Sequence, residues 1–256
     1  MKIKSNPKMK LQIPDMNCDG GYNDNLEKYE MLNHLNKFCF TAIIGLPGSG
    51  KTSTLVSFLT GKKDSCVFRK KFNHILLVMP AHSRESLKVN IFKKHHAEKM
   101  FDELNYKTIT TIHDKLVASS EEKETTLLIL DDVGASLKLA DIQRTFKTII
   151  YNRRHLKVKI VILLQSYVSL VRECRKLLNN ILIFKPSLTE WETLFHELFE
   201  TIDFDYAKKL LKWAYTEPHS YLFLNVPSQK LYLNFDEIIL PDEDKDETTK
   251  NTLKHK

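Results

Sequence analysis

Cysteine is scarce in this chain, and its four cysteines are far apart, at positions 18, 39, 66 and 174. They form no C-x-x-C pair, so we expect neither a disulfide scaffold nor a cysteine-based zinc site, and a reducing compartment fits best. No apolar run approaches the roughly 18 residues that a membrane span needs. The basic start of the chain has no apolar stretch behind it, so we expect no secretory signal and no secretion.

Glycine is also scarce, and its distribution is uneven. The 256 residues include seven glycines, and three of them stand within residues 45–50. The stretch fits the phosphate-binding pattern G-x-x-x-x-G-K-[ST] with Gly45, Leu46, Pro47, Gly48, Ser49, Gly50, Lys51 and Thr52. The alternative is a glycine-rich turn with a chance lysine. It is disfavoured because a predicted strand over 38–44 precedes the motif and a predicted helix over 51–59 follows it.

This loop motif predicts an ATP site over residues 45–53, which ends at Ser53. Glycine lets backbone N–H groups point inward at the phosphates, and the start of the next helix adds a partial positive charge. We expect Lys51 to reach the β- and γ-phosphates and the Thr52 hydroxyl to bind Mg²⁺.

Apolar runs alternate with amphipathic helical patterns along most of the chain. We predict strands over 38–44, 74–79, 125–130, 158–164 and 180–184, and a terminal hairpin over 221–225 and 230–234. Fully apolar runs are typical of strands covered on both faces, so the pattern predicts an α/β fold with a mostly parallel sheet and helices on both faces. We divide the chain into an arm with a short helix (1–36), an ATPase domain (37–240) and a disordered charged tail (241–256).

Two carboxylates, Asp131 and Asp132, close the predicted strand 125–130. Carboxylates at the end of a buried strand are costly unless a cation lies nearby. We assign Asp131 to Mg²⁺ and Asp132 to the general base that activates water. The alternative is that an aspartate here only caps the next helix.

Gln165 directly follows the predicted strand 158–164, where it could sense the γ-phosphate or orient water. An ordinary loop residue is the alternative. Arg153 and Arg154 lie at the end of the helix between the two strands. They are candidates for an arginine finger presented to a neighbouring subunit, although cations are favoured at helix ends for reasons unrelated to function.

Basic residues exceed acidic ones, with a net charge of +7 and a pI near 9.0. Residues 61–115 hold 12 Lys and Arg against 6 Asp and Glu, which favours a DNA-facing surface over a merely soluble one. The histidines at 82, 95, 96 and 113 match no zinc spacing. We expect Trp191 and Trp213 in the core, and a capping box from Ser187 to Glu190.

The order of these motifs (GLPGSGKT, ILLVMP, LLILDDV, YNRRH, KIVILLQSY, NILIFKP) resembles poxvirus-type and virophage-type genome-packaging ATPases. These belong to the FtsK/HerA superfamily of P-loop NTPases. The resemblance covers about 38–237 and implies a RecA-like ASCE fold and a ring-forming, ATP-driven motor that moves double-stranded DNA into a preformed capsid. It further implies a capsid or portal-vertex partner, and a place in the host-cell cytoplasm (the viral factory) and the virion.

Carried over residue by residue, the resemblance makes Lys51 and Thr52 ligands of nucleotide and Mg²⁺. It makes Asp131 and Asp132 the second motif and Gln165 the sensor. The second acid is often glutamate in cellular members, and aspartate has a shorter reach. Two alternatives stay open, a small-molecule kinase of the P-loop type and a DNA-stimulated ATPase that does not package. We see no arginine-rich lid of the kind that such kinases need.

Overall fold

The computed structural model describes residues 30–35, 38–60, 67–87, 90–199 and 202–239. Most of the predicted N-terminal arm and the whole predicted tail therefore lie outside the described residues. The short helix expected before the ATPase domain is present as α1 (Glu30–Leu35). No helix in the described ranges has the length and apolar character that crossing a membrane requires.

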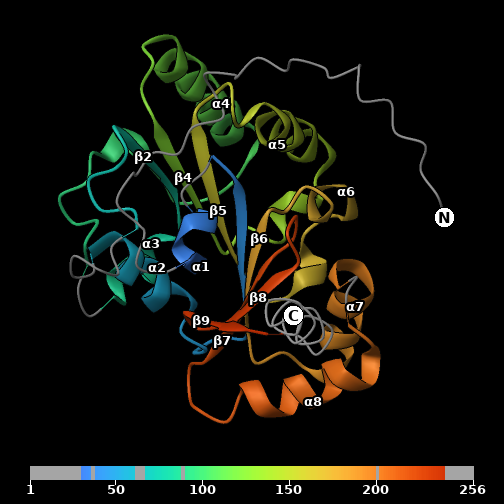
Figure 1. Ribbon diagram of the computed structural model, residues 1–256. Helices are drawn as coiled ribbons and strands as arrows, with labels where there is room; N and C mark the ends of the chain where they lie inside the picture. Colours follow the sequence, from blue (N-terminus) through green and yellow to red (C-terminus); the bar gives the residue numbers. More distant parts are fainter. Residues whose placement is uncertain (1–29, 36–37, 61–66, 88–89, 200–201, 240–256) are drawn as a thin grey trace, which may run out of the picture.

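The described strands form one nine-stranded sheet at the centre of the molecule (Figure 1). Its order is β3-β2-β4-β5-β1-β6-β7-β8-β9. The strands are β1 (Phe40–Ile44), β2 (His74–Val78), β3 (Met100–Phe101), β4 (Thr126–Asp131), β5 (Val158–Leu164), β6 (Asn180–Phe184), β7 (Tyr221–Asn225), β8 (Lys230–Leu233) and β9 (Asp236–Ile238). The six strands from β3 to β6 in this order run parallel, and β7, β8 and β9 extend the sheet in antiparallel fashion. The mostly parallel α/β fold and the terminal hairpin are confirmed.

Helices cover both faces of this sheet, because the strands carry apolar side chains on both sides. On one face, apolar residues of α4 (Tyr106–Glu121), α5 (Ala140–Asn152), α7 (Leu188–Leu198) and α8 (Phe204–Ala214) form one hydrophobic cluster that includes Ala42 and Ile44 of β1. On the other face, apolar residues of α1 and α2 (Lys51–Thr60) form a second cluster that includes Ile43. Successive residues of β1 thus point to opposite layers, as the two-residue period of a strand requires. Two short helices, α3 (Ala81–Glu85) and α6 (Arg172–Arg175), complete the set.

The order β1-β5-β4 decides where the site forms. β5 pairs with β1 on one side and with β4 on the other, with Ile44 opposite Leu164 and Asp131 opposite Leu163. The carboxyl ends of the three strands therefore meet at one edge of the sheet. This is the edge where ligands bind in open α/β folds.

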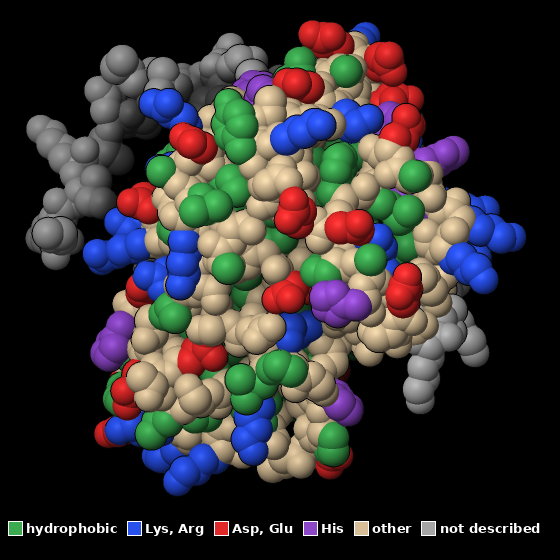
Figure 2. Space-filling model, turned by 180° about the vertical axis from the view of Figure 1, so that it is seen from behind, with side chains coloured by type: hydrophobic (Ala, Val, Ile, Leu, Met, Phe, Trp, Pro, Cys, Tyr) green, Lys and Arg blue, Asp and Glu red, His purple; other side chains and the backbone are tan. Residues whose placement is uncertain are grey.

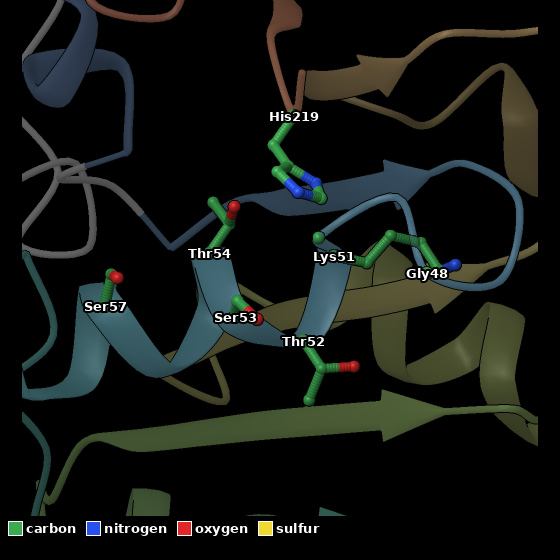
Figure 3. A pocket seen from close by; sticks show the side chains of 8 residues that line it. Gly48, Lys51, Thr52, Ser53, Thr54, Ser57 and His219 are labelled. Carbon is green, nitrogen blue, oxygen red and sulfur yellow. The ribbon is translucent and has the colours of Figure 1, made fainter. Parts of the chain in front are cut away.

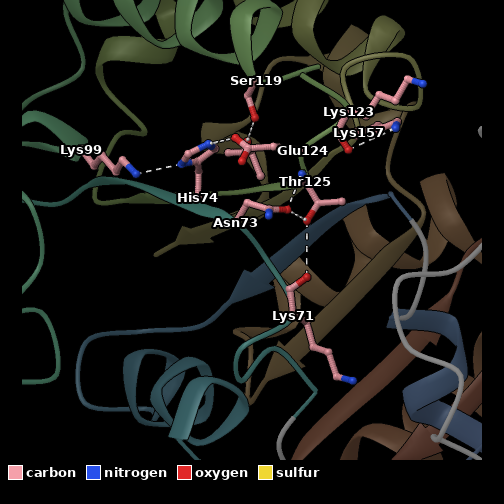
Figure 4. A network of polar contacts seen from close by, with 10 residues as sticks. Lys71, Asn73, His74, Lys99, Ser119, Lys123, Glu124, Thr125 and Lys157 are labelled. Atoms are coloured by element: carbon pink, nitrogen blue, oxygen red, sulfur yellow. Dashed lines mark hydrogen bonds and ion pairs between the residues drawn. The ribbon is translucent and has the colours of Figure 1, made fainter. Parts of the chain in front are cut away.

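The opposite edge of the sheet carries polar networks that tie elements together (Figure 4). The His74 ring contacts the Glu124 carboxylate and lies 2.8 Å from the Lys99 ammonium nitrogen, while Thr125 and Asn73 join the starts of β2 and β4. Each contact links a strand start to a neighbouring segment, which is a structural role.

One residue of β5 departs from its apolar pattern. Lys159 is fully buried, and its ammonium group donates hydrogen bonds to Cys39 Sγ at 2.6 Å and Thr41 Oγ1 at 2.9 Å. Burial lowers the pKa of Lys159, and its contact with Cys39 opposes that shift in part. Buried amines are tolerated only with such partners, because losing water penalises the charged form.

Two sequence expectations need correction. Trp191 is buried and donates to Ala207 O at 3.1 Å, but Trp213 is 54% exposed, because it lies on the outer side of α8. Ser187 does cap α7 by accepting a hydrogen bond from Glu190 N at 3.2 Å. The Glu190 carboxylate, however, accepts a hydrogen bond from Tyr167 N at 2.5 Å instead of closing the box, because the η3 turn (Tyr167–Ser169) lies against α7.

Candidate functional site

The phosphate-binding loop joins β1 to α2 as predicted. Gly48 and Gly50 have φ angles of 76° and 108°, a backbone region that other residues rarely occupy. Ser49 N donates to Leu46 O at 3.2 Å and so closes the loop, and Gly45 N donates to Leu164 O at 3.1 Å. The last bond fixes the loop to β5, the strand that leads into Gln165.

Lys51 is half-buried and folds back over the loop. Its ammonium group donates to Gly45 O at 2.6 Å and to Leu46 O at 3.0 Å. Burial lowers the pKa of Lys51, and the charges of Asp131 and Asp132 oppose that shift. The lysine charge therefore lies within electrostatic reach of both acids, across the space between loop and strand β4.

The two acids lie at the end of β4. Asp131 is half-buried, and its pKa is raised to about 6, first by burial, then by the negative charge of Asp132, with Lys51 opposing both effects. Asp132 has a φ of 56°, a left-handed conformation that costs a non-glycine residue energy and is common at functional sites. A strained turn with two adjacent carboxylates favours a functional role over a simple helix cap.

Gln165 joins Asp132, as the sequence suggested. Its Nε2 donates to Asp132 Oδ1 at 3.3 Å. Both residues line a hollow of about 360 Å³ together with Gly134, Lys138 and Ser169. The hollow is large enough for a water molecule and for a side chain or phosphate next to it. Lys138 was not foreseen, because its place beside Gln165 depends on the β4–β5 pairing.

A larger cavity of about 430 Å³ lies along the loop and the first turns of α2 (Figure 3). Its lining residues are Gly48, Gly50, Lys51, Thr52, Ser53, Thr54, Ser57 and His219. His219 reaches this cavity from the segment between α8 and β7, and its Nδ1 lies 3.0 Å from Ser49 O. Because a carbonyl only accepts, Nδ1 carries the hydrogen. Sequence reasoning missed His219, since no motif marks the turn that carries it.

The donors at this site fit Mg²⁺ held jointly with a nucleotide. Mg²⁺ binds through one or two carboxylates and substrate phosphates rather than through an all-protein cage. Asp131 offers one carboxylate, whose pKa is raised by burial and by the neighbouring Asp132 charge, and Thr52 offers a hydroxyl. Within the described ranges no cluster of three or more His, Cys, Asp or Glu side chains could hold a metal by itself.

The two arginines of the predicted finger lie at the other end of β5. α5 ends at Asn152 and β5 begins at Val158, so Arg153 and Arg154 stand at the amino edge of the sheet. At about 3.3 Å per residue, the seven-residue strand puts roughly 20 Å between them and Gln165. Arg153 donates a hydrogen bond to Ile150 O at 2.9 Å in the last turn of α5, and burial lowers its pKa. Its side chain thus satisfies a carbonyl at the end of this helix. Arg154 is exposed.

Only some of the described basic residues of segment 61–115 face solvent together. Lys93 and Lys94 are exposed in the turn before β3, whereas the neighbouring His95 turns inward, with Nε2 2.8 Å from Ile75 O. On the face in Figure 2, basic side chains are most frequent at the flanks and the lower end, while acidic side chains crowd the upper end and also lie across the middle. On that face, no single basic stripe marks a DNA path.

Comparison with known proteins gives one family and one fold. The family model described as "Poxvirus A32 protein" matches residues 27–199, which is more than half of the chain. The search of curated proteins found no match to this chain.

Several solved structures share the fold. The genome-packaging NTPase B204 of Sulfolobus turreted icosahedral virus 2, in complex with ATP-gammaS, has a TM-score of 0.57 at 15% identity, and the match covers 79% of this chain and 98% of that one. The type VII secretion ATPase EccC of Thermomonospora curvata has a TM-score of 0.52 at 10% identity, covering 79% and 24%. EssC of Geobacillus thermodenitrificans has a TM-score of 0.50 at 12% identity, and the match covers 78% of this chain and 40% of that one. At these identities the likeness establishes the α/β ATPase fold.

Proposed function

The chain belongs to the poxvirus A32 family of packaging ATPases, and from this premise we propose that it is an ATP-hydrolysing motor that moves double-stranded viral DNA into a preformed capsid. The observation that carries the proposal is the meeting of three motifs at one sheet edge. The phosphate-binding loop follows β1, the acid pair ends β4 and Gln165 ends β5, with β5 between the other two strands.

Lys51 and the loop bind the triphosphate in this proposal. Lys51 leaves the carbonyls of Gly45 and Leu46 for the β- and γ-phosphates, because a charged phosphate oxygen is a stronger acceptor than a carbonyl. Thr52 and Asp131 would hold Mg²⁺, and a bound Mg²⁺ would supply positive charge to the phosphates. With a pKa of about 6, Asp131 is mostly a carboxylate at pH 7.5, and the nearby cation would lower this pKa further.

Asp132 acts as the general base, with Gln165 as its partner. The Gln165 amide donates to one carboxylate oxygen of Asp132 and leaves the other free to accept a proton from water. Both side chains line the hollow beside the end of β5, where a water could be held in line with the γ-phosphate. Because its amide lies next to the base, Gln165 could also respond to the presence or absence of the γ-phosphate.

A packaging motor needs other subunits, DNA and a capsid as partners. We propose a homo-oligomeric ring around double-stranded DNA, docked at a capsid or portal vertex, in the host-cell cytoplasm where virions assemble and in the virion. The ring supplies Arg154 as the finger from a neighbouring subunit, since the structure puts this residue far from the acids of its own chain. Arg153 is the poorer candidate because its guanidinium is half-buried.

ATP hydrolysis with and without long double-stranded DNA tests the function. A motor hydrolyses faster with DNA, whereas a small-molecule kinase is indifferent to DNA and needs a phosphoryl acceptor. Lys51→Ala is the control that separates this site from a contaminating ATPase. Hydrolysis that DNA leaves unchanged would contradict the motor, and DNA stimulation without packaging into emptied capsids would favour a DNA-stimulated ATPase with another task.

A further inference from the structure

Among the described residues that line the proposed ATP cavity, only His219 lies outside the phosphate-binding loop and α2. It lies on the segment between α8 and β7, which is fixed to the sheet on both sides. Tyr215 donates from its hydroxyl to Ile183 O at 2.7 Å before the turn, and Tyr221 pairs with Phe184 after it. The position of His219 is therefore set by the end of β6, independently of α2.

The His219 ring lies directly against the loop. Its Nδ1 donates to Ser49 O at 3.0 Å, and a β-carbon placed on Gly50 would come within 3.4 Å of the ring. His219 has a φ of 62°, in the left-handed region like several other turn residues of this chain, and this turn carries the imidazole to the loop.

The same cavity extends from the loop to the first turns of α2. In the proposed complex the loop and Lys51 hold the phosphates, so we place the nucleoside in the rest of this cavity, beside the first turns of α2. That part of the cavity is lined by Ser53, Thr54 and Ser57, with His219 opposite (Figure 3). A volume of about 430 Å³ is within the range that small-molecule sites occupy.

We propose that His219 is a nucleoside-binding residue whose ring packs on the ribose and base of ATP, with the hydrogen bond from Nδ1 to Ser49 O setting the position of the ring. The inference rests on the ATPase function proposed above and adds a contact that the loop motif does not contain. A flat, half-polar ring suits this task because it stacks on a base with one face and keeps its hydrogen bond in the ring plane.

Two ligands separate a nucleoside contact from an effect on loop shape. Binding of ATP-gammaS and of inorganic triphosphate, each with Mg²⁺, is measured by calorimetry. For His219→Ala we expect roughly tenfold weaker binding of ATP-gammaS and a change of less than about twofold for triphosphate, which has no nucleoside. His219→Phe keeps a flat ring and should retain most of the ATP-gammaS affinity. The control is His155→Ala, an exposed histidine at the opposite edge of the sheet.

Equal losses for both ligands in His219→Ala would overturn the nucleoside contact and leave only support of the loop. Unchanged binding of both ligands would show that His219 is a surface residue, and so overturn the proposal. Wild-type protein that binds neither ligand would refute the ATPase function itself, so the two failures are distinct. Thermal unfolding of each variant checks that the fold is intact.

Discussion

Replacement of Asp131 by asparagine should stabilise the metal-free protein while it damages the enzyme. The Asp131 carboxyl has a pKa raised to about 6 from an ordinary 3.8, first because it is buried and then because Asp132 lies next to it. Each pKa unit corresponds to about 1.4 kcal/mol, so at pH 7.5 the ionised carboxylate costs the folded state about 2–3 kcal/mol. Asparagine has the same shape and no charge, and it removes this cost.

The sign of the pH dependence follows from proton binding. Between about pH 4 and pH 6 the folded protein holds a proton on Asp131 that the unfolded chain has lost, so the wild type loses stability as pH rises through this window. The advantage of Asp131→Asn should therefore be about 2–3 kcal/mol at pH 7.5 and fall below about 1 kcal/mol at pH 4.

Urea unfolding in EDTA at the two pH values measures this difference. Asp114→Asn is the matched control, because that side chain is 75% exposed and should change stability by less than about 0.5 kcal/mol. With Mg²⁺ and ATP the order should reverse, since the wild type gains binding energy that the variant lacks. An advantage of equal size at both pH values would refute the reasoning, because it could not come from ionisation.

Four further results are expected. Asp132→Asn should bind ATP and Mg²⁺ but hydrolyse poorly, as an amide accepts no proton from water; lost binding with residual turnover, measured by calorimetry and phosphate release, would exchange the roles of the two acids. Arg154→Ala and Lys51→Ala subunits, each nearly inactive alone, should regain part of the DNA-stimulated ATPase when mixed before assembly, and no rescue would contradict the finger. Charge reversal at residues 93–94 should flatten the salt dependence of DNA binding, whereas an unchanged slope in filter binding would place the DNA elsewhere. Lys159→Met should remove a rise in stability as the pH increases toward the ordinary lysine pKa of about 10.4, since burial lowers the pKa of Lys159 and the unfolded chain holds the extra proton below that pH; identical slopes in urea unfolding would contradict this.

Much of the site could be predicted because its information is local. The loop motif needs glycine where φ is positive, and Gly48 and Gly50 have that conformation. The acid pair and Gln165 were predictable from apolar runs that end in polar residues. In a parallel sheet such ends share one edge, and Gln165 lies 3.3 Å from Asp132.

Other residues were misjudged because their setting depends on distant segments. The periodicity of α8 put Trp213 in the core, but only the packing of the helix decides which side faces the sheet, and Trp213 is 54% exposed. Lys159 stands in an apolar strand, and its partner Cys39 is 120 residues away in the sequence.

The amino-acid sequence by itself determined the kind of protein: a parallel α/β ATPase with its phosphate loop, its acid pair and its polar strand end. These features are set by hydrophobic periodicity and backbone conformation, which act over a few residues. Tertiary structure alone decided that β5 lies between β1 and β4, that Arg153 and Arg154 lie at the sheet edge opposite the acids, and that His219 contacts the loop. Strand order and the meeting of Ser49 with His219 come from packing between segments 170 residues apart, and no local pattern records it.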